Sequence, residues 1–385
     1  MPRIKHYWDI LITYFIMLLD WGVISLSPKR RNGSDQLLIV RVDYIGDFIL
    51  WLDTAKYLRE KFSDYNITLI TYQPCKDLAE KFPYWDHVWS LDLNRFRYNP
   101  IYRFQVARKV CNFGFKIAIQ PTHSRTFFCG DSIIRASNSL IRIGVTGDMS
   151  NITPWRKKIS DSWYTHLIIT QSDQEIIRNS QFINVLLDID TKPHISKIPV
   201  IANLSTNLQV HRPYYVLFPG ASSKHRRWPV ENFIELSIRI NNECGWKGVV
   251  CGVAEEYELC EKIVSGNSSK LVNLAGKTNL LELIEIIRNG SLLISNDTSG
   301  IHIAPSVDTP SVCILGGGQK NRFFPYPVET MPGEFSPLCV TYNMSCFGCD
   351  WRCKYQLHKD SPFPCIKQIA VDDVLKTCRK LVDFR

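Results

Sequence analysis

Short apolar runs alternate with amphipathic segments along most of the chain. The runs Leu37–Val42, Ile67–Thr71 and Lys116–Gln120 are rich in Leu, Ile and Val and predict buried strands. The stretch from 48 to 62 has helical spacing and directly follows the first run. This alternation is typical of a doubly wound α/β layer built on a parallel sheet.

The periodicity is lost between about 190 and 213, a stretch rich in Pro, Asn, Ser and Thr that predicts an interdomain linker. A second alternation follows it. Strands are expected within 214–220, 248–252, 271–276, 291–297 and 311–318, and helices within 230–241, 255–264 and 280–287. We therefore expect an α/β protein with two Rossmann-like domains facing a cleft.

Five segments are expected along the chain. They are an amphipathic amino-terminal helix (1–34), an N-terminal Rossmann-like acceptor domain (35–195), a linker (196–213), a C-terminal Rossmann-like donor domain (214–338), and a cysteine-rich segment with a terminal helix (339–385).

The amino-terminal stretch "WDILITYFIMLLDWGVISL" is the only membrane-like segment. Asp9, Thr13 and Asp20 form a narrow polar stripe, and basic residues flank both ends. A spanning helix would be longer and lack the aspartates, and a signal peptide would need a small-residue cleavage site. The pattern favours a helix lying on a membrane surface. A helix packed on this protein or a partner, and a true span, are the alternatives.

Composition narrows the possible partners. Hydrophobic residues make up 45% and charged residues 22%, which excludes a disordered or fully membrane-embedded chain. The 46 basic and 37 acidic residues leave a net charge of +9, which favours nucleotides, phosphorylated glycans, anionic lipids or nucleic acid. Basic and aromatic residues do not interleave as on nucleic-acid-binding surfaces, so no nucleic-acid partner is expected.

Candidate chemistry gathers where predicted strands end. In "RVDYIGDF", Asp47 follows the first strand and either caps the next helix or acts as a general base. In "FPGASSKHRRWP", the cations at 224–227 precede a helix and either form a solvated surface or clamp a diphosphate. In "SNDTSG", residues 295–300, a strand runs into a helix whose first N–H groups suit a phosphate. In "ILGGGQKNRFFPYP", three glycines allow a ligand to approach the backbone.

Three stretches together resemble glycosyltransferase family nine, the heptosyltransferases of lipopolysaccharide assembly. They are "LLIVRVDYIGDFIL", "FPGASSKHRRWPVENFIEL" and "LAGKTNLLELIEIIRNGSLLISNDTSGIHIAPSVDTPSVCILGG", in matching order over about residues 37 to 330. The resemblance implies a GT-B fold and an inverting transfer without a catalytic metal, commonly from ADP-heptose. The acceptor would be a lipopolysaccharide-type or other cell-surface glycan, or a lipid-linked glycan, at the inner face of the cytoplasmic membrane.

The resemblance also implies roles for individual residues. Asp47 matches the family's catalytic base. The donor-binding residues would be Lys224, Arg226, Asp297, Thr298, Ser299, Gly300 and His302, with Glu255 or Glu256 holding the donor ribose. A catalytically silent nucleotide-sugar-binding protein on the same fold is the alternative. Asp47 separates the two hypotheses, because a binding module needs no base at that turn.

Nine of the thirteen cysteines are scattered, and four crowd into one short region. Cys346, Cys349, Cys353 and Cys365 have the spacing of a tetrahedral metal site, and a reducing cytoplasm disfavours disulfides. A structural zinc or iron ion is the leading interpretation, with an iron–sulfur cluster or an unmetallated thiol patch as alternatives. The cluster lies beyond the candidate catalytic motifs, so we expect it to rigidify the carboxyl-terminal lobe or an oligomer contact.

Overall fold

The computed structural model describes residues 2–26, 35–200, 208, 210–268, 270–319, 321–327, 335–355, 358 and 360–383. The side chains of 2–6, 8 and 9 lie outside this description, as do the basic residues at 29–31. The chain forms two compact units. The first contains Met1–Tyr44, Thr54–Ser172 and Ile177–Thr191; the second contains Ile45–Asp53, Asp173–Ile176 and Lys192–Arg385.

The first unit is built on a six-stranded parallel sheet in the order β3-β2-β1-β4-β5-β6. Its strands are β1 (Gln36–Arg41), β2 (Asn66–Tyr72), β3 (His87–Leu91), β4 (Ile117–Gln120), β5 (Ile141–Val145) and β6 (His166–Ile168). The strand order reverses between β1 and β4. In such sheets, ligands bind at the carboxyl ends of the two strands that flank this switch point.

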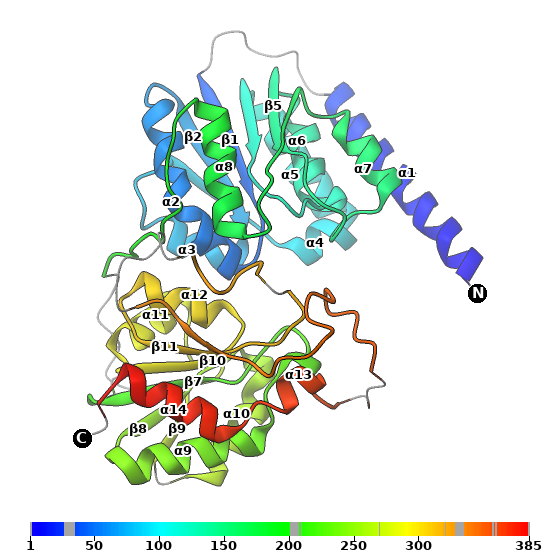
Figure 1. Cartoon of the computed structure of the whole chain (residues 1–385). Coiled ribbons are helices and arrows are strands. Elements are labelled where there is room, and N and C mark those ends of the chain that lie inside the picture. The colour runs from blue at the N-terminus through cyan, green and yellow to red at the C-terminus, as the bar shows by residue number, and fades with distance from the viewer. Residues whose placement is uncertain are drawn as a thin grey trace. The chain divides into compact units, whose positions relative to one another are not determined.

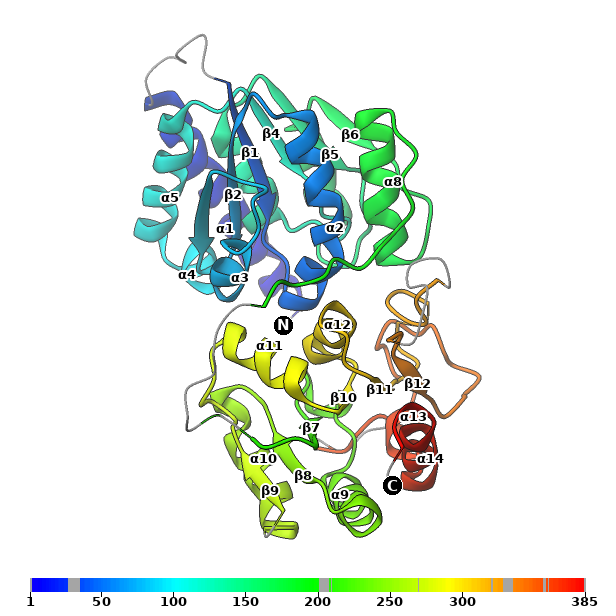
Figure 2. The same ribbon diagram turned by 90° about the vertical axis from the view of Figure 1, so that its left-hand side faces the viewer.

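Helices cover both faces of this sheet, with α2 and α8 on one face and α5 on the other (Figures 1 and 2). The helices are α1 (Pro2–Leu26), α2 (Ile45–Lys61), α3 (Lys76–Ala79), α4 (Leu93–Tyr98), α5 (Pro100–Phe113), α6 (Ser132–Ser137), α7 (Pro154–Asp161) and α8 (Glu175–Leu187). Leu38, Val40, Val110 and Phe115 belong to the buried core between sheet and helices. The β-branched and Leu-rich strands form because both of their faces are buried.

The second unit repeats the same strand order, written β12-β11-β10-β7-β8-β9, and every pairing is parallel. Its strands are β7 (Tyr214–Phe218), β8 (Lys247–Val250), β9 (Leu271–Asn273), β10 (Leu292–Asn296), β11 (Ser311–Ile314) and β12 (Leu338–Val340). The switch point lies between β7 and β10. The prediction of two parallel α/β layers is confirmed.

Helices again cover both faces of the second sheet, with α11 and α12 on one side and α9, α10 and α14 on the other (Figure 1). They are α9 (Val230–Cys244), α10 (Tyr257–Gly266), α11 (Leu280–Asn289), α12 (Ser299–Ser306), α13 (Pro364–Lys367) and α14 (Val371–Leu381). Val374, Leu375 and Cys378 of α14 are buried in the same core as Val312 and Val340. The terminal helix is therefore part of the second unit's core.

Helix α1 packs on the first unit through its polar stripe, against α5 and α6. The Asp20 carboxylate accepts from the Arg103 guanidinium at 2.8 and 3.0 Å, and both side chains are only 2% exposed. Thr13 is buried and accepts from Arg156 at 2.9 Å. The helix thus turns its polar side inward. No helix in the described part of the chain is both long and apolar enough to cross a bilayer.

Candidate functional site

The switch point of the second sheet brings together two of the predicted binding loops. Because Ser295 of β10 pairs with Phe218 of β7, the loops that follow these strands leave the sheet side by side. Asn296 fastens them to each other. Its amide donates to the Pro219 carbonyl at 2.7 Å and accepts from the Trp228 backbone N–H at 3.1 Å. Asn296 is 1% exposed, and this bridging role was not predicted from the sequence.

Arg226 and Asp297 meet between these loops. The Arg226 Nη2 donates to the Asp297 carboxylate at 3.1 Å and to its backbone carbonyl at 3.0 Å. Burial raises the pKa of Asp297, and the neighbouring guanidinium opposes that shift. Among the described residues, the buried Nε of Arg226 has no hydrogen-bond partner. The Arg226 side chain is 20% exposed, so part of its guanidinium can reach an anion.

Thr298, Ser299 and Gly300 form the turn into α12. Thr298 is the N-cap residue in an extended conformation, and its hydroxyl lies 3.2 Å from that of Ser295. The first N–H groups of a helix have no intrahelical partner and carry the positive end of its dipole. A Cβ added to Gly300 would meet the Phe218 ring at 3.3 Å, so the small residue allows α12 to approach β7. Together with Arg226, this turn can bind a phosphate.

His302 lies in the same helix but is 4% exposed. Its Nδ1 is 2.6 Å from the Tyr326 hydroxyl, and its ring stacks on Phe324 at 5.0 Å. Burial lowers the pKa of His302 to about 3, so the imidazole is neutral near pH 7. It cannot contribute a positive charge to an anion site.

Three more residues of this region, Lys224, Glu255 and Glu256, were predicted to contact the donor, and they lie in different surroundings. Lys224 is exposed and pairs with Asp360 at 3.0 Å. Glu256 is buried, pairs with Arg227 at 3.2 Å, and has its pKa raised by burial. Glu255 is exposed in the short 3₁₀ helix Ala254–Glu256, which precedes α10. Glu256 thus holds the Arg227 loop in place, while the carboxylate of Glu255 is accessible.

Asp47 is in the first turn of α2, and Tyr44 is the N-cap residue, without a side-chain cap. The first residues of α2, 45–53, belong to the second unit. A Cβ added to Gly46 would lie 2.8 Å from the His302 ring, so glycine is needed for this close approach. Asp47 is half-buried beside this contact. The same compact unit therefore contains Asp47 and the α12 turn.

The switch point of the first sheet carries a polar group that sequence reasoning missed. The Asp43 carboxylate forms an ion pair with Arg41 Nε at 2.8 Å and accepts a hydrogen bond from the Thr122 hydroxyl at 2.8 Å. Arg41 is fully buried and also donates to the Pro121 carbonyl at 2.6 Å. Asp43 follows β1 and Thr122 follows β4. The signal available in the sequence was a polar residue two positions after the end of each of two strands that proved to be neighbours.

The glycine loop after β11 is filled from within the chain. A Cβ on Gly317 would lie 2.1 Å from the Phe347 ring, and one on Gly318 would lie 2.2 Å from the Trp351 ring. The sequence suggested that a ligand approaches this backbone. The structure shows instead that aromatic side chains of the cysteine-rich segment occupy the space beside these two glycines.

The four clustered cysteines line one small cavity together with Met344, Trp351, Tyr355 and Phe363. Burial raises the pKa of the Cys365 thiol, and the nearby Cys346, Cys349 and Cys353 raise it further. All four are free thiols. No group of three or more His, Cys, Asp or Glu side chains in the described ranges has the arrangement of a metal site. The donor set still suits a soft cation, because four thiols share one cavity.

Two parallel Rossmann-type layers of this kind make up the GT-B architecture of glycosyltransferases. The model of glycosyltransferase family 9 (heptosyltransferase) matches residues 133–334, more than half of the chain. The chain belongs to this family and is a glycosyltransferase.

Known relatives agree with this assignment. Lipooligosaccharide heptosyltransferase 2 of Haemophilus influenzae is 22% identical over 296 residues, which are 73% of this chain and 83% of that protein. The family 9 glycosyl transferase of Veillonella parvula has a TM-score of 0.68 at 18% identity, over 92% of this chain and 99% of its own. The dodecameric iron-containing heptosyltransferase TibC, in complex with ADP-D-beta-D-heptose, has a TM-score of 0.56 at 14% identity, over 91% and 80%. At these identities the two structures share the fold with this chain.

Proposed function

We propose that the protein transfers a heptose from ADP-heptose to a hydroxyl of a lipopolysaccharide-type acceptor, with inversion at the anomeric carbon. The observation that carries this proposal is the pairing of Arg226 with Asp297 beside the amino terminus of α12. This Arg226–Asp297 pair lies where the carboxyl ends of β7 and β10 meet, the position at which open α/β sheets bind nucleotides.

The donor diphosphate would bind to this cluster. Arg226 offers its partly exposed guanidinium, and the first turn of α12 offers backbone N–H groups. The same groups stabilise the negative charge that develops on the diphosphate as the glycosidic bond breaks. The reaction on this proposal needs no catalytic metal ion. The exposed Glu255 would hold the ribose hydroxyls.

Asp47 would act as the general base. Its carboxylate takes the proton of the acceptor hydroxyl as the hydroxyl oxygen attacks the anomeric carbon, and ADP leaves with the bonding electron pair. A single displacement of this kind inverts the anomeric configuration. A catalytically silent sugar-nucleotide-binding protein remains the alternative, and it would not depend on the charge of Asp47.

The names of the relatives support the choice of sugar and acceptor. The curated relative acts, by its name, on lipooligosaccharide, and TibC was solved with ADP-D-beta-D-heptose. A donor screen with the purified protein tests this proposal. We expect release of ADP from ADP-heptose in the presence of a lipopolysaccharide core acceptor and no release of UDP from UDP-sugars. Turnover of a UDP-sugar alone would contradict it.

We also propose that Cys346, Cys349, Cys353 and Cys365 hold a structural iron or zinc ion. Their thiols line a common cavity, and TibC is described as iron-containing. Four thiolates would complete a tetrahedral shell and leave no position for substrate. The ion would supply a crosslink for the segment 346–365, and the ligands would need to move toward one another to bind it.

The metal content of the purified protein provides a direct test. We expect about one equivalent of iron or zinc per chain in protein prepared without added metal. The double variant Cys349→Ser, Cys353→Ser should lose it, because two ligands are removed. Cys111→Ser, which changes a half-buried thiol of α5, should retain it. Wild-type protein without either metal would refute the site.

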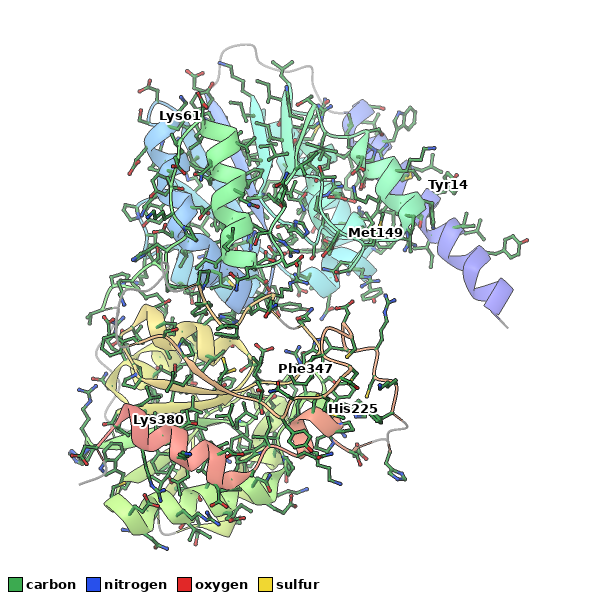
Figure 3. The ribbon with its side chains drawn as sticks, in the orientation of Figure 1. Tyr14, Lys61, Met149, His225, Phe347 and Lys380 are labelled. Atoms are coloured by element: carbon green, nitrogen blue, oxygen red, sulfur yellow. The ribbon has the colours of Figure 1, made fainter. Side chains whose placement is uncertain are left out.

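Membrane association is proposed for the outer face of α1. Exposed apolar residues cover this face: Tyr7, Leu11, Ile12, Tyr14, Phe15, Leu18, Trp21 and Leu26. Figure 3 shows Tyr14 pointing away from the first unit. Exposed Arg97, Arg108 and Lys158 lie on α4, α5 and α7, which belong to the same unit. An apolar face on a unit that also carries exposed basic residues suits an anionic bilayer surface. The protein would then act as a peripheral protein at the inner face of the cytoplasmic membrane.

Outward-facing substitutions test this association. We expect Phe15→Ser, Leu18→Ser, Trp21→Ser together to abolish sedimentation with phosphatidylglycerol vesicles, because most of the inserted apolar area is lost. Val185→Ser with Ile169→Ser, which also changes exposed apolar residues, is the matched control and should still bind. Equal binding by all three proteins would contradict the proposal. Deletion of α1 is a poorer test, since it also removes the Asp20 partner of Arg103 and uncovers the surface of α5 and α6 on which α1 packs.

A further inference from the structure

The cysteine-rich segment is paired to the glycine loop through its backbone. The Gly348 N–H donates to the Gly317 carbonyl and the Asp350 N–H to the Gly318 carbonyl, both at 2.7 Å. Phe347 and Trp351 fill the space beside the same glycines. Figure 3 shows Phe347 and His225 on the same side of the second unit. The segment is therefore fixed close to the loops that bind the donor on our proposal.

Three consecutive residues of the basic loop each contact this segment. Lys224 pairs with Asp360. His225 lies with its Nδ1 2.7 Å from the Ser361 carbonyl, and its own carbonyl accepts from the Phe363 N–H at 2.8 Å. The third residue, Arg226, contacts Trp351, which lies between Cys349 and Cys353 in the sequence.

The guanidinium carbon of Arg226 lies 4.3 Å from the centre of the Trp351 ring, within the range of a cation–π interaction. The ring itself is stacked against Phe363 at 5.5 Å. The backbone at Asp350 and Trp351 has φ of +49° and +59°, a left-handed conformation that side chains disfavour. Such a conformation persists only where surrounding contacts impose it. Trp351 is thus held in a defined position under Arg226.

We propose that Trp351 is a positioning residue for the donor site and presents the Arg226 guanidinium to the diphosphate. The Trp351 ring supports the face of the guanidinium, while Asp297 and Ser222 accept from its two terminal nitrogens. This arrangement fixes the orientation of a guanidinium that is still 20% exposed. The inference rests on the proposed binding of the donor diphosphate by Arg226.

The test measures ADP affinity by calorimetry in two variants that keep an apolar side chain at this position. Trp351→Leu removes the aromatic face, and we expect ADP binding to weaken about three- to thirty-fold. Trp351→Phe keeps a ring and should remain within about threefold of the wild type. Trp246→Phe, a partly buried tryptophan packed on the core of the same unit, is the fold control and should bind as the wild type does. Equal affinity of the Leu and Phe variants would overturn the proposal.

A double-mutant cycle separates this inference from the proposed function. If Trp351 acts through Arg226, Trp351→Leu should have no further effect on ADP affinity in an Arg226→Ala background. Full additivity of the two losses would overturn the positioning role while leaving diphosphate binding intact. An Arg226→Ala variant with wild-type ADP affinity would instead refute the proposed function of Arg226.

Discussion

Asp47→Asn is expected to lower turnover by about 10²- to 10⁴-fold, the range for loss of a general base. The amide has nearly the shape of the carboxylate but cannot accept the proton of the acceptor hydroxyl. ADP affinity should change by less than about threefold, because on our proposal the diphosphate is bound by Arg226 and the α12 turn and not by Asp47. Steady-state rates and calorimetry with ADP measure the two effects separately.

A matched control tests whether neutralising any acidic residue in the first turn of a helix lowers turnover. Asp77 is an exposed acidic residue in the first turn of the four-residue helix α3. Asp77→Asn should retain wild-type turnover. Near-normal turnover in Asp47→Asn would remove Asp47 from the mechanism and favour the silent binding protein.

Arg226→Ala is expected to weaken ADP binding by about 10- to 150-fold, since a hydrogen bond to a charged group contributes about 1.5–3 kcal/mol. Arg226 is the cation paired with Asp297 at the switch point, and its side chain is 20% exposed. Lys224→Ala should change ADP affinity by less than about threefold, because the Lys224 and Asp360 side chains are each 66% exposed and such surface pairs contribute little. The double variant should resemble Arg226→Ala alone.

The loss of Arg226 also leaves Asp297 buried without its partner, so stability must be measured alongside binding. Arg226→Lys keeps a positive charge and serves as the control for that effect. It should restore the melting temperature more fully than the affinity, because the ammonium cannot present the guanidinium's planar fork. Equal ADP affinity in Arg226→Ala and the wild type would show that the loop is only a basic surface.

Local patterns predicted the elements closely. The first strand was expected over 37–42 and runs from Gln36 to Arg41, and the helix expected over 230–241 runs from Val230 to Cys244. Alternation of buried strands with amphipathic helices leaves a clear signal in a single sequence. The gathering of the Arg226 and Asp297 loops was also expected, because both loops were assigned to the carboxyl ends of strands; the ion pair between the two residues was not predicted.

Contacts between distant segments could not be predicted in the same way. Trp351 is 125 positions from Arg226 (351 − 226), and neither carries a local signal of their stacking. Helix α1 packs with its polar side inward because Asp20 pairs with Arg103. In the sequence, Arg103 cannot be told from a surface arginine of an amphipathic helix. The glycine loop suggested an approaching ligand, since a sequence cannot show which group fills the space above a glycine. In each case, the partner is fixed by tertiary packing.

The stereochemistry of the product tests the central claim most directly. The purified protein would be given ADP-heptose of known anomeric configuration, labelled at the anomeric carbon, with a lipopolysaccharide core acceptor. Nuclear magnetic resonance of the product then reports the new glycosidic bond. Our account predicts a heptosylated acceptor of the opposite anomeric configuration, formed in step with ADP. A product of retained configuration, or an acceptor left unmodified while ADP-heptose remains intact, would contradict it.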